Sequence, residues 1–245
     1  NNNFNNWKLK NGENITIIDT TEIENSVRNL NLYFQNLGYL NNEVDFEVKK
    51  ENEKIANLIF QINTSGRYYI GENKSNIDSK IIDSIYKANS NKSKLKNNSF
   101  FNSINFDIER NRLFNLFKNN GVYDFQINSI LFSAEIDSTN NNLSIPIKTN
   151  IYGDDYSISK ISAINIIQSD SINSFNFNEN FIKSKIKFKS GDVFNDSLRK
   201  ASLRELNDLD LFNFPSIQYS INKDKSLNAN LLLNSKKKFG LGFGF

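Results

Sequence analysis

One pattern of apolar and polar positions recurs three times along the chain. In the first copy, polar residues at 19–21 offer N-cap oxygens, and apolar residues then recur every three or four positions, at Ile23, Val27, Leu30, Phe34 and Leu37. This spacing predicts an amphipathic helix, and Gly38 follows it where a left-handed C-terminal cap is expected. Apolar and polar residues then alternate over 44–48 and 58–62 on either side of a turn at 51–54, which predicts a hairpin.

The second copy has the same order of elements. Apolar residues at 113–117 predict a helix that ends at 119–121, and alternation over 130–136 and 143–147 predicts two strands around a turn-rich loop at 137–142. An earlier helix is expected from the isoleucines that follow Gly71 and Asn73, which are Ile77, Ile81, Ile82 and Ile85.

The third copy contains one ambiguous segment. A helix is predicted from Leu198, Ala201, Leu206 and Leu209, and Pro215 prevents its continuation before strands at 217–221 and 227–233. Apolar residues and lysines alternate over 182–188, and this local pattern alone is typical of a strand. The position of this segment in the repeat favours a first helix capped by 178–180, and we predict a helix there.

The repeat has a period of roughly 80 residues and predicts the fold class. We expect an α+β tandem array of three β-α-α-β-β modules, each a three-stranded mixed sheet covered by two helices. The expected boundaries are 1–66, 67–153 and 154–236, and the first module is N-terminally incomplete because 7–10 must supply or replace its opening strand. The alternative is a single α+β domain, which the turn-rich joints at 65–66 and 153–155 disfavour.

The last residues alternate between large apolar side chains and glycine. Phe239, Leu241, Phe243 and Phe245 are separated by single glycines, and lysines occupy 236–238. This pattern predicts that 237–245 begin the first strand of a transmembrane β-barrel, since apolar side chains on one face are typical of lipid-facing strands. The alternative is a floppy glycine-rich tail. Because the chain also starts at Asn1 rather than Met, we expect a processed or trimmed piece of a longer protein.

Composition narrows the chemistry that these modules can perform. The chain has no Cys and no His, which excludes disulfides, thiol nucleophiles, thiolate metal sites and the commonest general base. Its net charge of +3, with Lys and Glu interspersed, does not indicate nucleic acid as a partner. The 45 Asn residues indicate a low-GC codon bias rather than a prion-like tract, because periodic apolar positions persist throughout.

No group of residues predicts an active site or a cofactor. Ser–Lys pairs are expected by chance in a chain with 24 Lys, and the acidic residues Asp154, Asp155, Asp208 and Asp210 suit solvated turns and helix ends. Residues 137–142 lack the glycine and the terminal glutamate of a calcium loop, and no glycine-rich phosphate loop precedes a helix. We therefore expect no enzyme activity, no metal and no cofactor.

Three junctions resemble a known family. Residues 32–44, residues 109–123, and residues 191–194 together with 207–212 resemble the helix–glycine–aromatic–strand junctions of the polypeptide-transport-associated (POTRA) repeats of the BamA/TamA superfamily, most like a TamA-like protein of Bacteroidota. The third junction departs from this pattern because 211–212 lack the usual glycine. The motif residues of the three junctions are Gly38, Tyr39, Gly121, Tyr123, Gly191, Asp192, Leu211 and Phe212.

This resemblance implies a periplasmic region, attached to the bacterial outer membrane, of a β-barrel insertase. Its expected partners are unfolded outer-membrane proteins, accessory periplasmic or lipoprotein subunits, and its own C-terminal barrel. Clients would add as strands to the middle strand of each module. The alternatives are the POTRA region of a two-partner-secretion transporter, a periplasmic or surface adhesion module and, as a third class, a hydrolase. The implied client-binding residues are Val44, Asp45, Phe46, Glu47, Val48, Ile130, Leu131, Phe132, Ser133, Ala134, Ile217, Gln218, Tyr219, Ser220 and Ile221.

Overall fold

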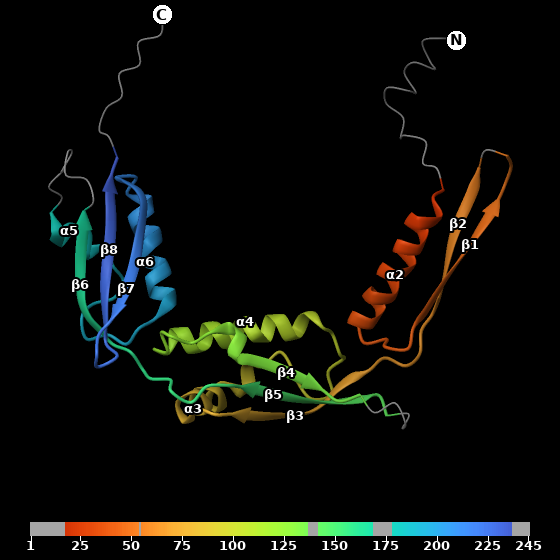
Figure 1. Ribbon diagram of the computed structural model, residues 1–245, viewed down its shortest axis with the longest axis horizontal. Helices are drawn as coiled ribbons and strands as arrows, with labels where there is room; N and C mark the ends of the chain where they lie inside the picture. The colour runs from red at the N-terminus through yellow and green to blue at the C-terminus, as the bar shows by residue number, and fades with distance from the viewer. Residues whose placement is uncertain (1–17, 54, 137–141, 169–177, 237–245) are drawn as a thin grey trace, which may run out of the picture. The chain divides into compact units, whose positions relative to one another are not determined.

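A computed structural model describes residues 18–53, 55–136, 142–168 and 178–236 (Figure 1). The helices are α2 (Thr20–Asn36), α3 (Lys80–Ala88), α4 (Ile104–Asn119), α5 (Glu179–Ser184) and α6 (Asp196–Asp208), with 3-10 turns η1 (Ser90–Lys92) and η2 (Ile127–Ser129). The strands are β1 (Glu43–Lys50), β2 (Ala56–Asn63), β3 (Tyr69–Ile77), β4 (Ile130–Ala134), β5 (Ser144–Ile151), β6 (Ile161–Gln168), β7 (Phe212–Ile221) and β8 (Leu227–Ser235).

The strands form three sheets. Two have three strands each, in the orders β3-β5-β4 and β6-β8-β7, and the third sheet is the β1–β2 hairpin. In the sheet of β6, β8 and β7, β8 is parallel to β6 and antiparallel to β7. The elements from β3 to β5, and again from β6 to β8, follow the predicted order of strand, helix, helix, strand, strand. The predicted mixed α+β architecture is thus confirmed for these two modules.

The described residues pack into two compact units. The first unit contains α2, β1 and β2 and reaches Gly71, together with 97–104 and 142–145. The second unit contains the remaining described residues, including α3 to α6 and the whole sheet of β6, β8 and β7.

The first unit is built on α2 and the hairpin. The Asp19 side chain caps α2 by accepting a hydrogen bond from the backbone N–H of Thr21 at 2.8 Å, and Gly38 follows the helix with φ +95°, as the sequence predicts. In the part of this module that the structure describes, there are two strands and one helix rather than three strands and two helices. The predicted opening strand at 7–10 lies outside the described residues.

The next module has a closed core beneath β3, β5 and β4. Its fully buried side chains come from α3, α4, the loop after α4 and the two later strands, and they include Ile82, Leu113, Phe117, Phe125, Ile130 and Ile151. One detail of the prediction is wrong: Ile77 is the last residue of β3, and Gly71 and Asn73 also lie in that strand. The helix α3 begins at Lys80, after the N-cap residue Ser79, whose hydroxyl accepts a hydrogen bond from the backbone N–H of Ile82. Ile77 lies before this cap and continues the alternation of the strand.

The last module has its core between α6 and the sheet of β6, β8 and β7 (Figure 1). The predicted helix at 182–188 is confirmed only in part: α5 is capped by Asn178 and ends at Ser184, so Ile186 and Phe188 follow it in a turn. The backbone N–H of Lys187 donates to the Ser202 hydroxyl of α6 at 2.8 Å, which holds this turn against the longer helix.

Two further predicted features fall on residues other than those described. The barrel strand at 237–245 lies outside the described residues, and so does the loop at 137–142 except for Asn142. Within the described ranges, no helix is both long and apolar enough to cross a membrane, and no group of acidic residues is arranged to hold a metal ion.

Candidate functional site: the edges of the three sheets

The predicted client-binding residues lie in β1, β4 and β7. Among the described residues, each of these strands has one hydrogen-bonded neighbour: β2 for β1, β5 for β4 and β8 for β7. The opposite side of each strand is therefore an edge. The residues belong to three separate sheets. The middle strand of the second module is shorter than the predicted 130–136, since it ends at Ala134.

The β4 edge is partly covered by α4. The Arg110 guanidinium lies over the Phe132 ring at 5.4 Å from its centroid, and its Nε donates to the Ile130 carbonyl at 3.4 Å. The Phe106 ring also packs edge-on against Phe132, with centroids 5.5 Å apart. Leu131, on the opposite face, is half exposed. The start of this edge therefore already contacts a helix, and the backbone beyond it is the more accessible part.

The β7 edge begins with an irregularity. Its register with β8 shifts between Asn213 and Ser216, and Phe214 has φ +47° with 95% of its surface exposed. Pro215 follows and cannot donate a backbone hydrogen bond. Bulges and prolines of this kind block strand pairing at sheet edges. The regular edge of β7 is therefore confined to 216–221.

A cavity of about 520 Å³ opens beside this regular part of β7. Its walls combine aromatic rings with charged groups from α4 and α6. The lining residues are Phe114, Lys118, Tyr123, Phe194, Asp196, Arg199, Lys200, Ile217, Gln218 and Tyr219.

Three aromatic rings form one wall of this cavity. The Tyr219 ring stands edge-on to Tyr123 and to Phe194, with centroid distances of 5.4 Å and 5.3 Å. Tyr123 and Phe194 also meet edge-on at 5.1 Å, so the three rings contact one another. Burial raises the pKa of the Tyr219 hydroxyl, which therefore stays neutral.

Charged groups line the rest of the cavity. Asp196 accepts hydrogen bonds from Arg199 Nε at 2.7 Å and from Lys200 Nζ at 2.8 Å. Burial raises the pKa of Asp196, but these two cations outweigh burial, so its pKa lies below the ordinary value and the carboxylate is ionised. Lys118 donates to the carbonyl of Tyr123, and its Nζ lies 4.8 Å from the Tyr123 ring centroid. Burial lowers the pKa of Lys118.

The edge of β1 differs because the hairpin is the most exposed sheet of the described chain. Val44 is buried, whereas Phe46 and Val48 are 39% and 37% exposed. Asp45 and Glu47 point to the alternate face. The apolar face of this strand is thus accessible along most of its length.

Two of the motif glycines, Gly38 and Gly121, form matching joints with the chain that follows them. The carbonyl of Gly38 accepts a hydrogen bond from the N–H of Tyr68 at 2.8 Å, and the carbonyl of Gly121 accepts one from Ser159 at 2.9 Å. Both glycines have left-handed backbones, at +95° and +97°. Tyr39 and Tyr123 follow the joints, and Tyr39 packs edge-on against Phe34.

The third junction uses other residues for the same backbone geometry. Asp210, with φ +55°, occupies the place after α6 that glycine has after α2 and α4. The next residue, Leu211, accepts from the N–H of Lys236 at 2.9 Å, and Phe212 is buried at the start of β7. Gly191 and Asp192 lie earlier, where the Asp192 carbonyl accepts from the N–H of Ile161 at 2.8 Å.

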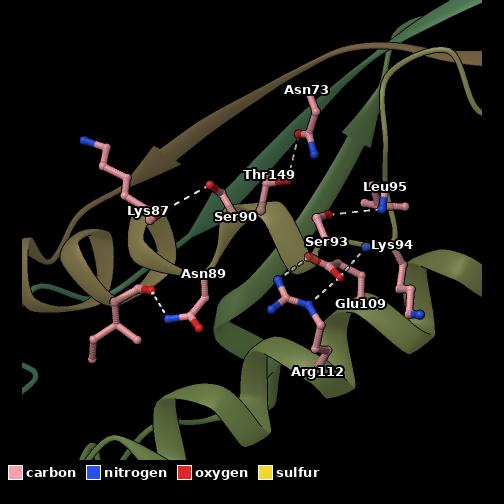
Figure 2. Close-up of polar contacts among 11 residues, drawn as sticks. Asn73, Lys87, Asn89, Ser90, Ser93, Lys94, Leu95, Glu109, Arg112 and Thr149 are labelled. Carbon is pink, nitrogen blue, oxygen red and sulfur yellow. Dashed lines mark hydrogen bonds and ion pairs between the residues drawn. The ribbon is translucent and has the colours of Figure 1, made fainter.

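A buried ion pair stabilises the second module away from these edges (Figure 2). The Glu109 carboxylate accepts from Arg112 Nη2 at 2.7 Å and Nε at 2.8 Å, and from the N–H of Lys94 at 2.9 Å. Burial raises the pKa of Glu109, but these donors outweigh burial and keep its pKa below 4.5. The charge is neutralised within the module, which indicates a structural role.

The charged residues of the β7 cavity are absent from the sequence-based prediction. Asp196, Arg199 and Lys200 share one side of α6 because they are spaced by three and four residues, and this spacing was a usable signal. Lys118 gave no such signal, because it lies in α4, far in sequence from α6 and β7. It lines the cavity because the chain folds back after α4.

No protein-family model matches the chain, and no curated protein matches it in sequence. Several solved structures are similar to it. Haemophilus ducreyi BamA lacking POTRA domains 1–3 is 9% identical, with 69% of this chain and 30% of that chain covered and a TM-score of 0.52. POTRA domains 3–5 of Haemophilus influenzae BamA are 12% identical, with 87% and 80% covered and a TM-score of 0.46. CdiB from Acinetobacter baumannii is 14% identical, with 91% and 40% covered and a TM-score of 0.32.

The similarity to the Haemophilus ducreyi protein shows a shared fold. This chain spans 30% of that protein. The fold is mixed α+β, with three-stranded sheets and helices in the order that the resemblance to POTRA repeats implies.

Proposed function

We propose that this chain is the periplasmic POTRA region of an outer-membrane β-barrel insertase, either TamA-like or BamA-like. In this role it binds unfolded outer-membrane proteins, or accessory periplasmic or lipoprotein subunits, by strand addition, and it scaffolds the assembly complex beside its own barrel. The three modules are 1–66, 67–153 and 154–236, and the barrel begins at 237. The role is one of binding and scaffolding rather than catalysis.

The observation that supports this proposal is that β1, β4 and β7 each lie at the edge of their sheet. β1, β4 and β7 have one neighbour each among the described residues. Main-chain groups along such an edge pair with an extended segment whatever its side chains are, which suits a protein with many different clients. The outer-membrane setting of the proposal is supported by the fold shared with BamA from Haemophilus ducreyi.

Site-specific photo-crosslinking tests the proposal. A photoreactive residue at Glu47, Ser133 or Ser220 places the probe on β1, β4 or β7, and the same residue at Asn115 on the exposed side of α4 is the control. The full chain is mixed with an outer-membrane barrel protein diluted from urea and, separately, with the same protein already folded in detergent micelles.

We expect the edge positions to capture the unfolded protein several-fold better than Asn115 does, and better than they capture the folded protein. Equal labelling at Asn115 overturns strand addition. Labelling by folded partners alone favours the adhesion module instead.

A further inference from the structure

The cavities beside β4 and β7 differ in their balance of charge. Among the residues that line the β7 cavity, the three cations Lys118, Arg199 and Lys200 outnumber the one carboxylate, Asp196. The β4 cavity, of about 240 Å³, is lined by residues of β3 and β5 and of the end of β4, and its acidic and basic residues are equal in number: Glu72, Glu135, Lys74 and Lys148. The β7 cavity therefore has an excess of positive charge that the β4 cavity lacks.

Two of the three cations are paired with one buried carboxylate. Asp196 is 9% exposed and binds two of the cations, Arg199 and Lys200, whose side chains are 27% and 52% exposed. One carboxylate neutralises about one of these charges. The third cation, Lys118, lies near the ring centroids of Tyr123 and Phe194, at 4.8 Å and 5.5 Å. Ring faces attract a cation but do not neutralise it.

An added strand would direct side chains into this cavity. Ile217 and Tyr219 lie on the face of β7 that packs toward α6, and both line the cavity. Neighbouring residues on paired strands project to the same face of a sheet. A side chain opposite Ile217 or Tyr219 on an added strand therefore points toward the cations of α6 and toward Lys118.

We propose that this cavity binds the carboxylate of an Asp or Glu side chain on an extended segment that adds as a strand to β7. This inference rests on the proposed function, because it requires strand addition at that edge. The stem of the acidic side chain contacts the wall formed by Tyr123, Phe194 and Tyr219, and its carboxylate meets Arg199, Lys200 and Lys118. The β7 edge thus selects segments by charge, whereas the β4 edge does not.

Peptide labelling on the full chain tests the inference. The probes are twelve-residue peptides of alternating Val and Thr, blocked at both ends, that carry Glu, Gln or Lys at one central position. A photoreactive residue at Ile221, which is 58% exposed and lies outside the cavity, reports occupancy of the β7 edge. A photoreactive residue at Leu131 reports the β4 edge. We expect the Glu peptide to half-saturate labelling at Ile221 at about one tenth of the Gln peptide's concentration, with no preference at Leu131.

Two variants locate the preference. Lys200→Gln is expected to reduce the Glu preference at Ile221 several-fold, and Lys118→Met to reduce it similarly. Lys148→Gln in the β4 cavity is the matched control and is expected to leave the preference unchanged. Circular dichroism confirms that each variant is folded before the comparison.

The outcomes separate the two proposals. Equal labelling by the Glu and Gln peptides overturns the inference and leaves strand addition intact. Labelling by none of the peptides at either edge overturns the proposed function itself. A Gln peptide with a free C-terminus that binds as well as the blocked Glu peptide assigns the cavity to chain termini, which also overturns the side-chain inference.

Discussion

The last strands of the first and third modules have similar sequence patterns and very different surroundings. β8 lies between β6 and β7, and its inward positions, Leu227, Ala229, Leu231 and Leu233, are at most 1% exposed. β2 pairs, among the described residues, with β1 alone, and Leu58, Ile59 and Ile62 remain 37–40% exposed. Alternation in the sequence therefore specifies a strand, while the neighbours on both of its sides decide how much of it is buried.

Helices contribute to the same difference. α5 and α6 both supply buried side chains to the core around β8, including Ile182 and Leu206. In the described part of the first module, α2 is the helix that accompanies the hairpin, and Ile23 is its one buried residue. Four substitutions test how far the contrast extends, from the largest expected effect to the smallest.

Leu231→Ala should give the largest loss of stability. The side chain is fully buried between sheet and helices, so its truncation leaves a cavity and is expected to cost about 2–5 kcal/mol. Hydrogen exchange read by mass spectrometry over β6 to β8 measures the loss locally. Unchanged protection there would contradict a closed core around β8.

Glu109→Gln should lower the free energy of unfolding of the second module by about 3 kcal/mol. The Glu109 side chain is 2% exposed, so Arg112 would be left without an opposing charge in a buried site. The pH dependence has a definite sign. The pKa of Glu109 is lower in the folded state, so its contribution is present above the ordinary pKa of 4.5 and is lost as pH falls through the folded-state pKa.

Urea unfolding at pH 7 and at progressively lower pH checks both parts of this prediction. The wild-type chain should lose more stability on acidification than the Glu109→Gln variant does. Parallel loss in the two proteins would show that Glu109 contributes nothing to acid sensitivity.

Gly38→Ala tests the joint next to the open hairpin and should cost about 2 kcal/mol. A Cβ at this position would meet the Phe101 carbonyl oxygen at 2.9 Å, in addition to the strain of a left-handed backbone. Gly191→Ala is the matched control, since its φ of +91° is similar and no atom lies within 4 Å of the added Cβ. Its cost should be about 1 kcal/mol. Equal shifts in thermal unfolding would show that the Phe101 contact is unimportant.

Leu58→Ala should have the smallest effect, below about 1 kcal/mol, because the side chain is already 37% exposed. Chemical unfolding of this variant beside Leu231→Ala measures the contrast directly. A loss as large as that of Leu231→Ala would mean that the hairpin is covered in solution.

The sequence predicted the repeated elements well because each one depends on local periodicity. The helix at 20–36 and its glycine stop follow from residues within one element, and so does the strand of β8. The predictions failed where neighbours in space decide the outcome. Ile186 and Phe188 leave the predicted helix because the turn after α5 packs on Ser202, fifteen residues or more away in sequence.

The candidate site shows the same limit. Periodicity identified the middle strands, and the family resemblance supplied the idea that they are edges. Neither the periodicity nor the resemblance showed that Lys118 and Tyr123 lie close to α6 and β7. Their approach depends on the joint at Gly121, which is distant in sequence from those elements. Likewise, Asp210 replaces glycine in a left-handed turn, and its sequence neighbours give no sign of that role.

The parallel pairing of β6 with β8 has a consequence for the order of folding. β7 and β8 are joined by a short turn and can pair early, whereas β6 must wait for a partner that follows two helices and another strand. We therefore expect the sheet of β6, β8 and β7 to be closed last by β6. Before that step, the hairpin is open on the β8 side, and any extended chain nearby competes with β6 for the same row of backbone groups. Pairing of β6 with β8 occupies this row of backbone groups and removes the competition.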